Sequence, residues 1–455
     1  MAATGGDIAR ACGVELPTGP RGEQAAWILS VFEFILDNGA EALDFSTVHP
    51  RFAPRREGEI DEGFLRGVWA TAARRMGGAT IVAAGEPSET ELEVLLEVDE
   101  GRRFWLRLEI EPDEPHRLRG WTTAPAVPAG ITIRRAEAGD AAALVELERQ
   151  APIVVGDSSI HFEHEADYFS PWELLEEPGA VVAVTDDGRV LAALQDAVVP
   201  IRVNGAVYRG AYAHRVRTHP DHAGLGLLQH LTRAGLEVRP VGVAMDAIVV
   251  CIGKGNTAML KGWAGRPGEW PAGPTRFLID TTQMGGDAGA AVEVCADLDA
   301  AVACLNETHD RDEGYVPYTA LSFRARLNRA PHLYGPSLLF GLGGAVVGLW
   351  EAGATVRTVV TRGDVRVTQR RAIAADWGFR PGRDDDLAAL LVALCGRLAQ
   401  RGLTHLAVFA SPITPGWEVL SSLASSRDEF HMWTQPLQLA PDADRRGTYV
   451  DALAF

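Results

Sequence analysis

Lysine is almost missing from this sequence of 455 residues. Only two of its 43 basic residues are lysines, Lys254 and Lys261, and both fall in one short stretch. We interpret the arginine bias as the mark of a GC-rich bacterial genome. Cysteine is also scarce, with five residues scattered along the chain and no C-x-x-C pair. This spacing argues against a disulfide framework or a zinc knuckle and favours reduced thiols.

Long apolar runs and a surplus of positive charge are missing as well. No stretch approaches the ~20 apolar residues that a membrane span needs. The first residues, MAATGGDIARACG, have neither a basic start nor an apolar core, so we expect no signal peptide and a cytoplasmic protein. The net charge of −18 opposes binding to nucleic acid or to a membrane surface.

Several catalytic motifs do not occur. The sequence has no G-x-S-x-G, no G-x-x-x-x-G-K-[ST] and no H-E-x-x-H. Gly341–Gly344 stand between two apolar runs that resemble strands, which is not the strand-to-helix setting of a dinucleotide site. The sequence therefore gives no support for a nucleophile elbow, a P-loop or a zincin.

The length suggests about three domains. Two Pro/Gly-rich joints, 111–130 and 281–290, divide the chain. We therefore expect domains at 1–125, 130–281 and 290–455, and a fold class of α+β or mixed α/β.

The first block reads as helices followed by paired strands. Helices are predicted over 23–39 and 62–77 from apolar spacing, and a hairpin over 91–111 around Asp99-Glu100-Gly101. Over Glu23–Gly120 this order resembles small accessory domains of the nuclear-transport-factor-2-like or cystatin-like type.

The second and third blocks follow one element order. In the second, Asp140 is expected to cap a helix after the strand at 131–135, two strands flank Asp186-Asp187-Gly188, and a long strand runs to Pro220. A helix, a buried strand and a short helix follow. Because the third block repeats strand, helix, hairpin, strand and helix, we predict a tandem duplication, with a final strand at 447–455.

The stretch RVRTHPDHAGLGLLQHL, from Arg215 to Leu231, predicts a strand, a turn with two glycines and a helix. A helix start leaves backbone N–H groups without partners, and the helix dipole favours an anion there. Glycines let the backbone approach a phosphate closely. Gly224 and Gly226 therefore predict a phosphate cradle.

This stretch resembles motif A of the GNAT superfamily of acyl-CoA-dependent N-acyltransferases. The matching residues are Thr218, His219, Pro220, Gly224 and Gly226, and the resemblance covers Ile131–Asp280. Two positions depart from the family pattern, because Ala223 replaces an Arg or Gln and Leu228 replaces a small residue. Downstream, Asn256 matches the family's asparagine, whereas Trp263 stands where many members have a catalytic tyrosine.

The resemblance implies two GNAT-like mixed-sheet domains and an acyl-CoA co-substrate, either acetyl-CoA or another acyl-CoA. The implied CoA-binding residues are Val216, Arg217, Thr218, Ala223, Gly224, Leu225, Gly226, Leu227, Leu228 and Asn256. It also places an N–H for the oxyanion near Thr218. Lys254 and Lys261 could meet the phosphates or be solvated. The third block carries Asp384, Asp385 and Asp386 at the equivalent helix start, which would repel a pyrophosphate, so we interpret it as a half that does not bind CoA.

An amine acceptor must lose a proton before it attacks, so a base is expected. His214 and Tyr212 share one face of the predicted strand, and His214 is either this base or a structural histidine. Glu163 belongs to a predicted loop, GDSSIHFEHEADYF, that either shapes the acceptor site or is merely solvated. The H-x-x-H of His161 and His164 lacks a third ligand, so no metal is predicted.

The leading hypothesis is an N-acyltransferase, an N-acetyltransferase in its simplest form, that acts on a small-molecule amine. The alternative is an inactive protein that binds CoA or a metabolite. A third reading, an aminoacyl-tRNA-dependent transferase, is disfavoured by the net charge of −18. No nucleic-acid or membrane partner is predicted, and the sequence does not specify the oligomeric state.

Overall fold

The computed structural model describes residues 80–455 except 85–90, 99–101, 111–117, 166, 238–244, 264–267, 285–291, 436–446 and 454–455. The predicted helices at 23–39 and 62–77 lie outside the described residues. Contacts within the chain divide it into two units, one of residues up to Thr132 with Ala223–His230, and one of Ile133–His222 with Leu231–Phe455.

The first unit contains an antiparallel sheet in the order β1-β2-β3-β4. Its strands are β1 Thr80–Ala84, β2 Glu91–Val98, β3 Arg102–Ile110 and β4 Leu118–Ala126. The predicted hairpin is confirmed, because Glu91 pairs with Glu109 and Val98 with Arg102. Strand β4 corrects the prediction of an irregular joint at 111–130. It ends the sheet and contains Pro125, and an edge strand tolerates a proline that an inner strand would not.

The remaining strands are β5 Ile131–Arg135, β6 Ile153–Val155, β7 Ser158–His164, β8 Glu176–Thr185, β9 Val190–Val203, β10 Ala206–Thr218, β11 Ala247–Gly253, β12 Thr275–Asp280, β13 Glu293–Val294, β14 Asp312–Glu313, β15 Leu339–Leu342, β16 Ala345–Trp350, β17 Val356–Arg362, β18 Val365–Gln369, β19 Arg371–Phe379, β20 His405–Ala410, β21 Ser426–Gln435 and β22 Gly447–Thr448. The helices are α4 Ala141–Gln150, α5 Leu227–Glu237, α6 Thr257–Trp263, α7 Leu298–His309, α8 Ala320–Leu327, α9 Asp384–Gln400 and α10 Trp417–Leu423. Single turns lie at η4 Ala138–Asp140, η5 Ser170–Leu174, η6 Pro220–His222, η7 Pro336–Leu338 and η8 Ala352–Ala354.

One large mixed sheet joins the second and third predicted blocks. Its order is β13-β15-β16-β19-β20-β12-β21-β11-β10-β9-β8-β5. Strand β12, from the second block, lies between β20 and β21 of the third, and β21 lies against β11 of the second. The predicted mixed α/β class is confirmed. The tandem origin and the predicted domain boundaries stay predictions.

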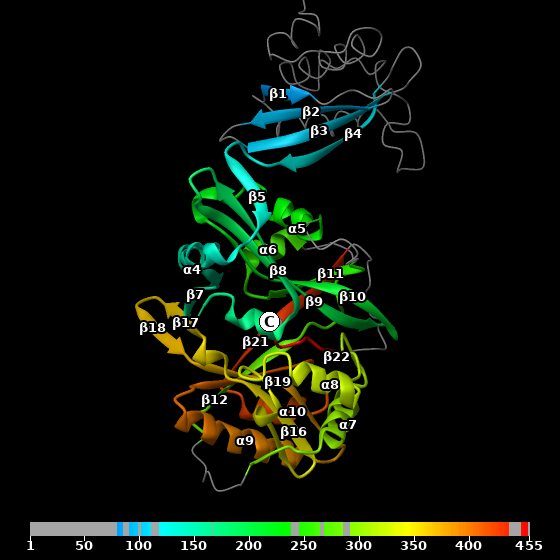
Figure 1. Ribbon diagram of the computed structural model, residues 1–455, viewed down its shortest axis with the longest axis vertical. Helices are drawn as coiled ribbons and strands as arrows, with labels where there is room; N and C mark the ends of the chain where they lie inside the picture. Colours follow the sequence, from blue (N-terminus) through cyan, green and yellow to red (C-terminus); the bar gives the residue numbers. More distant parts are fainter. Residues whose placement is uncertain are drawn as a thin grey trace, which may run out of the picture. The chain divides into compact units, whose positions relative to one another are not determined.

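Helices cover both faces of this sheet in its C-terminal part (Figure 1). Alternate residues of a strand point to opposite faces. In β16, Val346 and Trp350 share a core with residues of α7, while Val347 and Leu349 share another with residues of α9. Strand β16 is therefore buried on both sides, which explains why all six of its residues are apolar or glycine.

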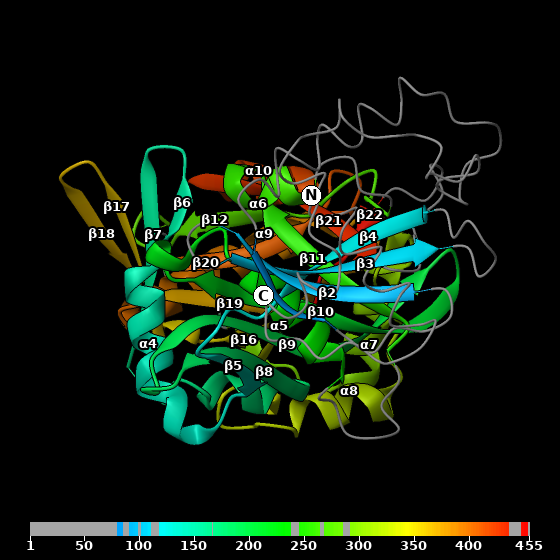
Figure 2. The same ribbon diagram turned by 90° about the horizontal axis from the view of Figure 1, so that it is seen from above.

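A smaller sheet corrects the prediction for GDSSIHFEHEADYF. Residues Ser158–His164 form strand β7, in the sheet β18-β17-β7-β6. Figure 2 shows the hairpins β6–β7 and β17–β18 side by side. Serine, histidine and glutamate weaken a strand signal read from the sequence alone. The pairing with β17, about 200 residues later in the chain, supplies the missing backbone partners.

The C-terminal end differs from the prediction too. The apolar spacing of GWEVLSSLASSRDEF predicts a helix over 416–430, but α10 ends at Leu423, and Ser426–Gln435 form β21, which lies inside the large sheet between β12 and β11. The final strand expected at 447–455 is reduced to Gly447–Thr448, which pair in parallel with β14. No helix in the described part of the chain is long and apolar enough to span a membrane.

Candidate active site

Strand β10 carries a β-bulge near its C-terminal end. His214 lies opposite Gln195 of β9, and Arg217 lies opposite Ala193, so β10 has one residue more than β9 between these pairs. Arg215, inside the bulge, has a φ of +46°. A bulge takes its extra residue out of the ladder. It therefore makes a backbone N–H available for another acceptor, a few residues before the predicted position at Thr218.

On its other side, β10 parts from β11. The parallel pairing ends at Ala213 and Val250, although β10 continues to Thr218 and β11 to Gly253. Beyond this point β11 pairs with β21 on its other edge. The bulge and the end of the β10–β11 pairing lie within a few residues of each other. The last residues of β10, which we call the transfer segment together with the neighbouring part of β11, therefore have irregular backbone.

A buried charge cluster lies against the bulge. The guanidinium carbons of Arg215 and Arg217 lie 5.6 Å and 5.8 Å from the ring centre of Phe162. Glu148 of α4 is 1% exposed and bonds to His164 Nε2 at 2.8 Å. Burial alone would raise the pKa of Glu148, but the hydrogen bond from His164 and the two guanidiniums together lower it. Glu148 therefore stays ionised and balances the arginines.

The two predicted catalytic residues on β10 differ in chemistry. The rings of Tyr212 and His214 lie 6.4 Å apart, on one face of the strand as predicted. Burial, reinforced by Arg215, lowers the pKa of His214 to about 3, and its Nε2 atom is buried without a hydrogen-bond partner. Burial raises the pKa of Tyr212 well above its ordinary value. At neutral pH His214 is a weak base, whereas Tyr212 keeps its proton.

We expect His214 to destabilise the protein in acid. Between the unfolded pKa near 6.5 and the folded value of about 3, only the unfolded chain binds this proton. The free energy of unfolding therefore decreases as the pH falls through this range, by about 1.4 kcal/mol per pH unit. Urea unfolding at pH 6 and pH 5 should show a smaller loss for His214→Gln than for the wild type. Equal losses would contradict a depressed pKa.

The third predicted catalytic residue, Glu163, lies elsewhere. It is on β7, opposite Arg357 of β17, and its carboxylate pairs with the exposed Arg366 of β18. It does not line the cavity described below. Its catalytic role stays a prediction, while the described contacts are those of a surface ion pair. His161 Nε2 lies 3.9 Å from Glu163 Oε1. In the described residues no three metal-ligating side chains gather.

The predicted phosphate cradle is the turn before α5. Gly224 has φ +89° and Gly226 has φ +72°, a backbone conformation that favours glycine. A Cβ added to Gly224 would meet no atom of the described residues within 4 Å. Gln229 N–H donates to the Gly226 carbonyl at 3.0 Å, which closes the first turn of the helix. Left-handed glycines, open space and a helix start together fit a phosphate-bearing group.

The other predicted cofactor residues lie in the same two segments or further on. Ala223, Leu225, Leu227 and Leu228 belong to the cradle, and Val216, Arg217 and Thr218 to the end of β10. Asn256 accepts from Met259 N–H at 3.2 Å and so caps α6. Its CoA contact stays a prediction. Trp263 packs against Trp433, with ring centres 5.7 Å apart. Lys254 pairs with Glu429 at 2.7 Å.

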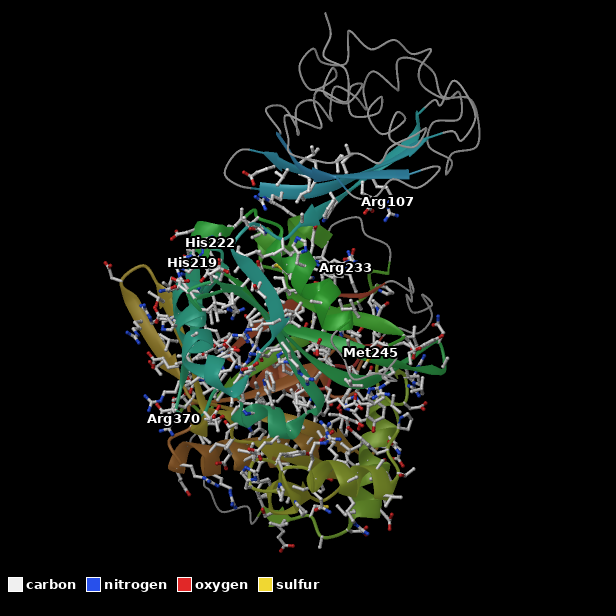
Figure 3. The ribbon with its side chains drawn as sticks, turned by 45° about the horizontal axis from the view of Figure 1, so that its top comes forward. Arg107, His219, His222, Arg233, Met245 and Arg370 are labelled. Atoms are coloured by element: carbon white, nitrogen blue, oxygen red, sulfur yellow. The ribbon has the colours of Figure 1, made fainter. Side chains whose placement is uncertain are left out.

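The turn between β10 and the cradle is fixed by His219. Its N–H donates to the Leu191 carbonyl at 2.7 Å, and its ring lies 5.6 Å from that of His222 (Figure 3). His219 Nε2 lies 2.7 Å from Arg189 Nη2. These bonds hold the His219-Pro220 turn against β9. They give His219 a structural role in the motif.

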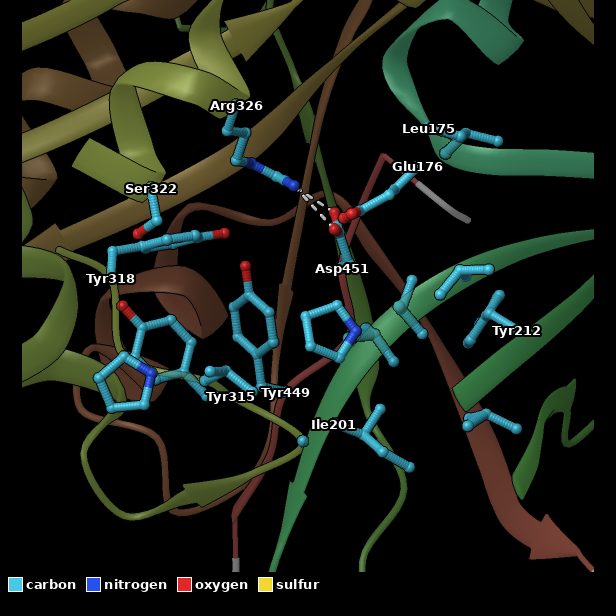
Figure 4. A pocket seen from close by; sticks show the side chains of 18 of the residues that line it. Leu175, Glu176, Ile201, Tyr212, Tyr315, Tyr318, Ser322, Arg326, Tyr449 and Asp451 are labelled. Atoms are coloured by element: carbon cyan, nitrogen blue, oxygen red, sulfur yellow. Dashed lines mark hydrogen bonds and ion pairs between the residues drawn. The ribbon is translucent and has the colours of Figure 1, made fainter. Parts of the chain in front are cut away.

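A cavity of about 410 Å³ opens beside the parting of β10 and β11, where Tyr212 and Val249 line it. Figure 4 shows Tyr212 on one side and Tyr315 and Tyr318 on the other, with Asp451 and Tyr449 between them. It is lined by residues 174–176, 198–201, 212, 249, 314–319, 322, 326, 329, 432 and 449–451. This size matches small-molecule sites.

A buried ion network forms one wall. Arg326 of α8 donates to both oxygens of Asp451, at 2.8 Å and 2.7 Å, and to Asp376 at 2.9 Å. Tyr334 and Tyr318 also donate to Asp376. Burial alone would raise the pKa of Asp451, but Arg326 outweighs it and lowers that pKa. Two carboxylates thus share one guanidinium.

Tyrosine rings continue this wall, and the guanidinium carbon of Arg326 lies 5.9 Å from the ring centre of Tyr318. Tyr315 meets Tyr449 at 4.9 Å and Tyr318 at 5.8 Å between ring centres, edge to face in both cases. The Tyr449 hydroxyl is buried and has no hydrogen-bond partner among the described residues, whereas the Tyr315 hydroxyl donates to Asn306. A buried hydroxyl without a partner is costly, so this oxygen is available to bond with a molecule in the cavity.

Tyr449 and Asp451 belong to the C-terminal segment, which is held in place by pairing with β14. Thr448 pairs with Glu313, and Tyr449 N–H donates to the Glu313 carbonyl at 2.8 Å. Sequence reasoning missed Tyr449 and Asp451 because it assigned them to a strand. The available signal was a tyrosine and an aspartate inside an apolar run, at positions that a strand would place on one face.

Comparison with known proteins identifies the class. A family model described as "Acetyltransferase (GNAT) domain" matches residues 133–239. The match confirms the predicted acyl-CoA-dependent N-acyltransferase of GNAT type, with acyl-CoA as co-substrate. The part of the chain that matches this GNAT model contains β10, the cradle and α5. No curated protein matches the chain.

Solved structures give distant likenesses. Saccharomyces cerevisiae N-myristoyltransferase with bound myristoyl-CoA has 9% identity and a TM-score of 0.48, covering 72% of this chain and 88% of that one. A GCN5-related N-acetyltransferase from Sphaerobacter thermophilus has 17% identity and a TM-score of 0.41, covering 68% and 97%. A GCN5-related N-acetyltransferase from Kribbella flavida has 14% identity and a TM-score of 0.36, covering 66% of this chain and 70% of that one. These likenesses carry no weight for activity.

Proposed function

We propose that this protein transfers an acyl group from acyl-CoA to the amine of a small molecule bound in the tyrosine-lined cavity. The observation that carries the proposal is that strand β10, inside the residues that match the GNAT family model, and the neighbouring strand β11 both contribute to the lining of this cavity. Tyr212 and Val249 line it, one residue before the pairing of β10 and β11 ends.

Acyl-CoA would supply an activated thioester. The backbone of Gly224 and Gly226 and the start of α5 would hold its phosphates, and the amide released by the β10 bulge would stabilise the developing oxyanion. The neutral amine attacks the carbonyl carbon, a C–N bond forms and the C–S bond breaks. The nitrogen loses one proton and the sulfur gains one.

Tyr212 is the residue that supports the last of these steps. It lines the cavity and keeps its proton at neutral pH, so it can donate to the leaving thiolate. His214 is unsuited to the role of base because its pKa is about 3. The acceptor therefore enters as the free amine or loses its proton through water.

We expect Tyr212→Phe to lower kcat roughly a hundredfold, since general acid catalysis contributes about that much. KM for acyl-CoA should change little, because the phosphate cradle is untouched. Release of free CoA, measured with acetyl-, propionyl- and malonyl-CoA across an amine panel, is the assay. Tyr208→Phe is the matched control, four residues earlier on the same face of β10.

Two results would decide against the proposal. If the wild type released no CoA with any pair of acyl-CoA and amine, the proposed transferase activity would be wrong. Binding of acyl-CoA without release would leave the alternative of an inactive CoA-binding protein. An equal loss in Tyr208→Phe and Tyr212→Phe would mean that Tyr212 acts through packing.

A further inference from the structure

The cavity has an excess of negative charge. Of the charged side chains that line it or bond to a lining side chain, Glu176, Asp376 and Asp451 are carboxylates, while Arg326 and Arg329 are guanidiniums. Arg326 is divided between two carboxylates, and Arg329 lies 3.5 Å from Glu176. Among the described residues, one negative charge is left without a counter-charge. The side chain of Asp451 is 24% exposed, so this charge is accessible from the cavity.

Aromatic faces stand next to that charge. Tyr315, Tyr318 and Tyr449 line the cavity with rings at 71° and 86° to one another. Ring faces attract a cation, and the attraction is stronger where water is excluded. The buried Tyr449 hydroxyl, which has no partner in the described part of the chain, offers an oxygen acceptor in the same wall. Charge, rings and hydroxyl together fit an ammonium group.

A carboxylate that stabilises an ammonium also keeps it protonated, and a protonated amine cannot attack. The nitrogen held at Asp451 is therefore not the nitrogen that reacts. The transfer segment lies at Tyr212 and Val249, on the other side of the cavity from Tyr315 and Tyr318 (Figure 4). One ligand can reach both sides only if it carries two nitrogens.

We infer that the acceptor is a small diamine or polyamine, with one ammonium anchored by Asp451 and the tyrosine wall and a second, neutral amine presented to the β10–β11 parting. The inference rests on the proposed function for the reacting end. The cation site itself is independent of turnover. Asp451 and Tyr449 are specificity residues, not residues of the acyl-transfer chemistry.

Binding without acyl-CoA tests the cation site alone. Calorimetry compares choline with 3,3-dimethyl-1-butanol, which has the same shape and hydroxyl but no charge. We expect choline to bind the wild type at least about tenfold more tightly. Asp451→Asn and Tyr449→Leu should remove this preference, and Asp299→Asn, an exposed aspartate of α7, should keep it. Tyr449→Leu keeps an apolar side chain in the wall. It therefore tests the cation site even if Asp451→Asn does not fold.

Equal affinities of the two probes, no binding of either, or a preference that survives in both folded variants would each overturn the cation site. Turnover then tests the diamine. The ratio of kcat/KM for 1,4-diaminobutane over 1-aminobutane should exceed about tenfold in the wild type. Equal use of both amines would overturn the inference and leave the proposed function intact. Cation binding without any CoA release would overturn the function and leave the site.

Discussion

Replacing Gly224 by valine is expected to weaken acyl-CoA binding roughly a hundredfold, about 2.7 kcal/mol. Gly224 has φ +89°, and a side chain there would point into space that holds no atom of the described residues within 4 Å of its Cβ. That open space is where a phosphate would approach the backbone of the cradle. The valine would fill it and would also strain the left-handed backbone that orients the amides.

The strain needs its own control, which the chain supplies. Gly188, in the turn between β8 and β9, has φ +85° and equally open surroundings. Gly188→Val should cost similar folding stability, about 1–3 kcal/mol, and leave the affinity for acetyl-CoA unchanged. Calorimetric titration of both variants separates the two effects. Similar loss of affinity in both would mean that general destabilisation, and not the cradle, is responsible.

The largest effect on stability is expected at Arg326. Replacing it by methionine would leave Asp376 and Asp451 without their shared cation, and breaking a buried ion network in this way costs about 3–5 kcal/mol. Asp376 is 1% exposed, so water cannot replace the guanidinium at that carboxylate. Thermal and urea unfolding measure the loss.

Arg324→Met, on the exposed side of the same helix, is the matched control and should change stability by less than about 0.5 kcal/mol. Adding Asp376→Asn to Arg326→Met should restore part of the loss, because it removes one uncompensated charge. A loss as small as that of the control would contradict the network. Failure of the double variant to recover any stability would locate the cost in packing.

Local patterns predicted the strands that precede the cradle. The apolar runs of β8 and β9 on either side of the turn at Gly188, the long strand β10 and the start of α5 all follow from apolar patterns and turn residues. The cradle glycines also adopt the left-handed backbone that a close approach to phosphate requires. These features depend on neighbours within a few residues, so the sequence carries enough information.

Other elements depend on distant partners. Strand β7 needs β17, and β21 needs the gap between β11 and β12, so neither has a strong local signal. The cavity shows this most clearly. Arg326 is 50 residues from Asp376 and 125 from Asp451, and their meeting is a product of the shared sheet. Only the tertiary fold reveals that an apparently apolar C-terminal run lines a polar site.

The most direct test of the account is a calorimetric titration of the full chain with acetyl-CoA and free CoA, for the wild type and a Gly226→Val variant. We predict binding of one molecule per chain, because the third block lacks the cradle. A ligand at 100 times its Kd should raise stability by about 2.7 kcal/mol. The variant should bind much more weakly. No binding of acetyl-, propionyl- or malonyl-CoA, or binding unaffected by the valine, would contradict the assignment of the acyl-CoA site.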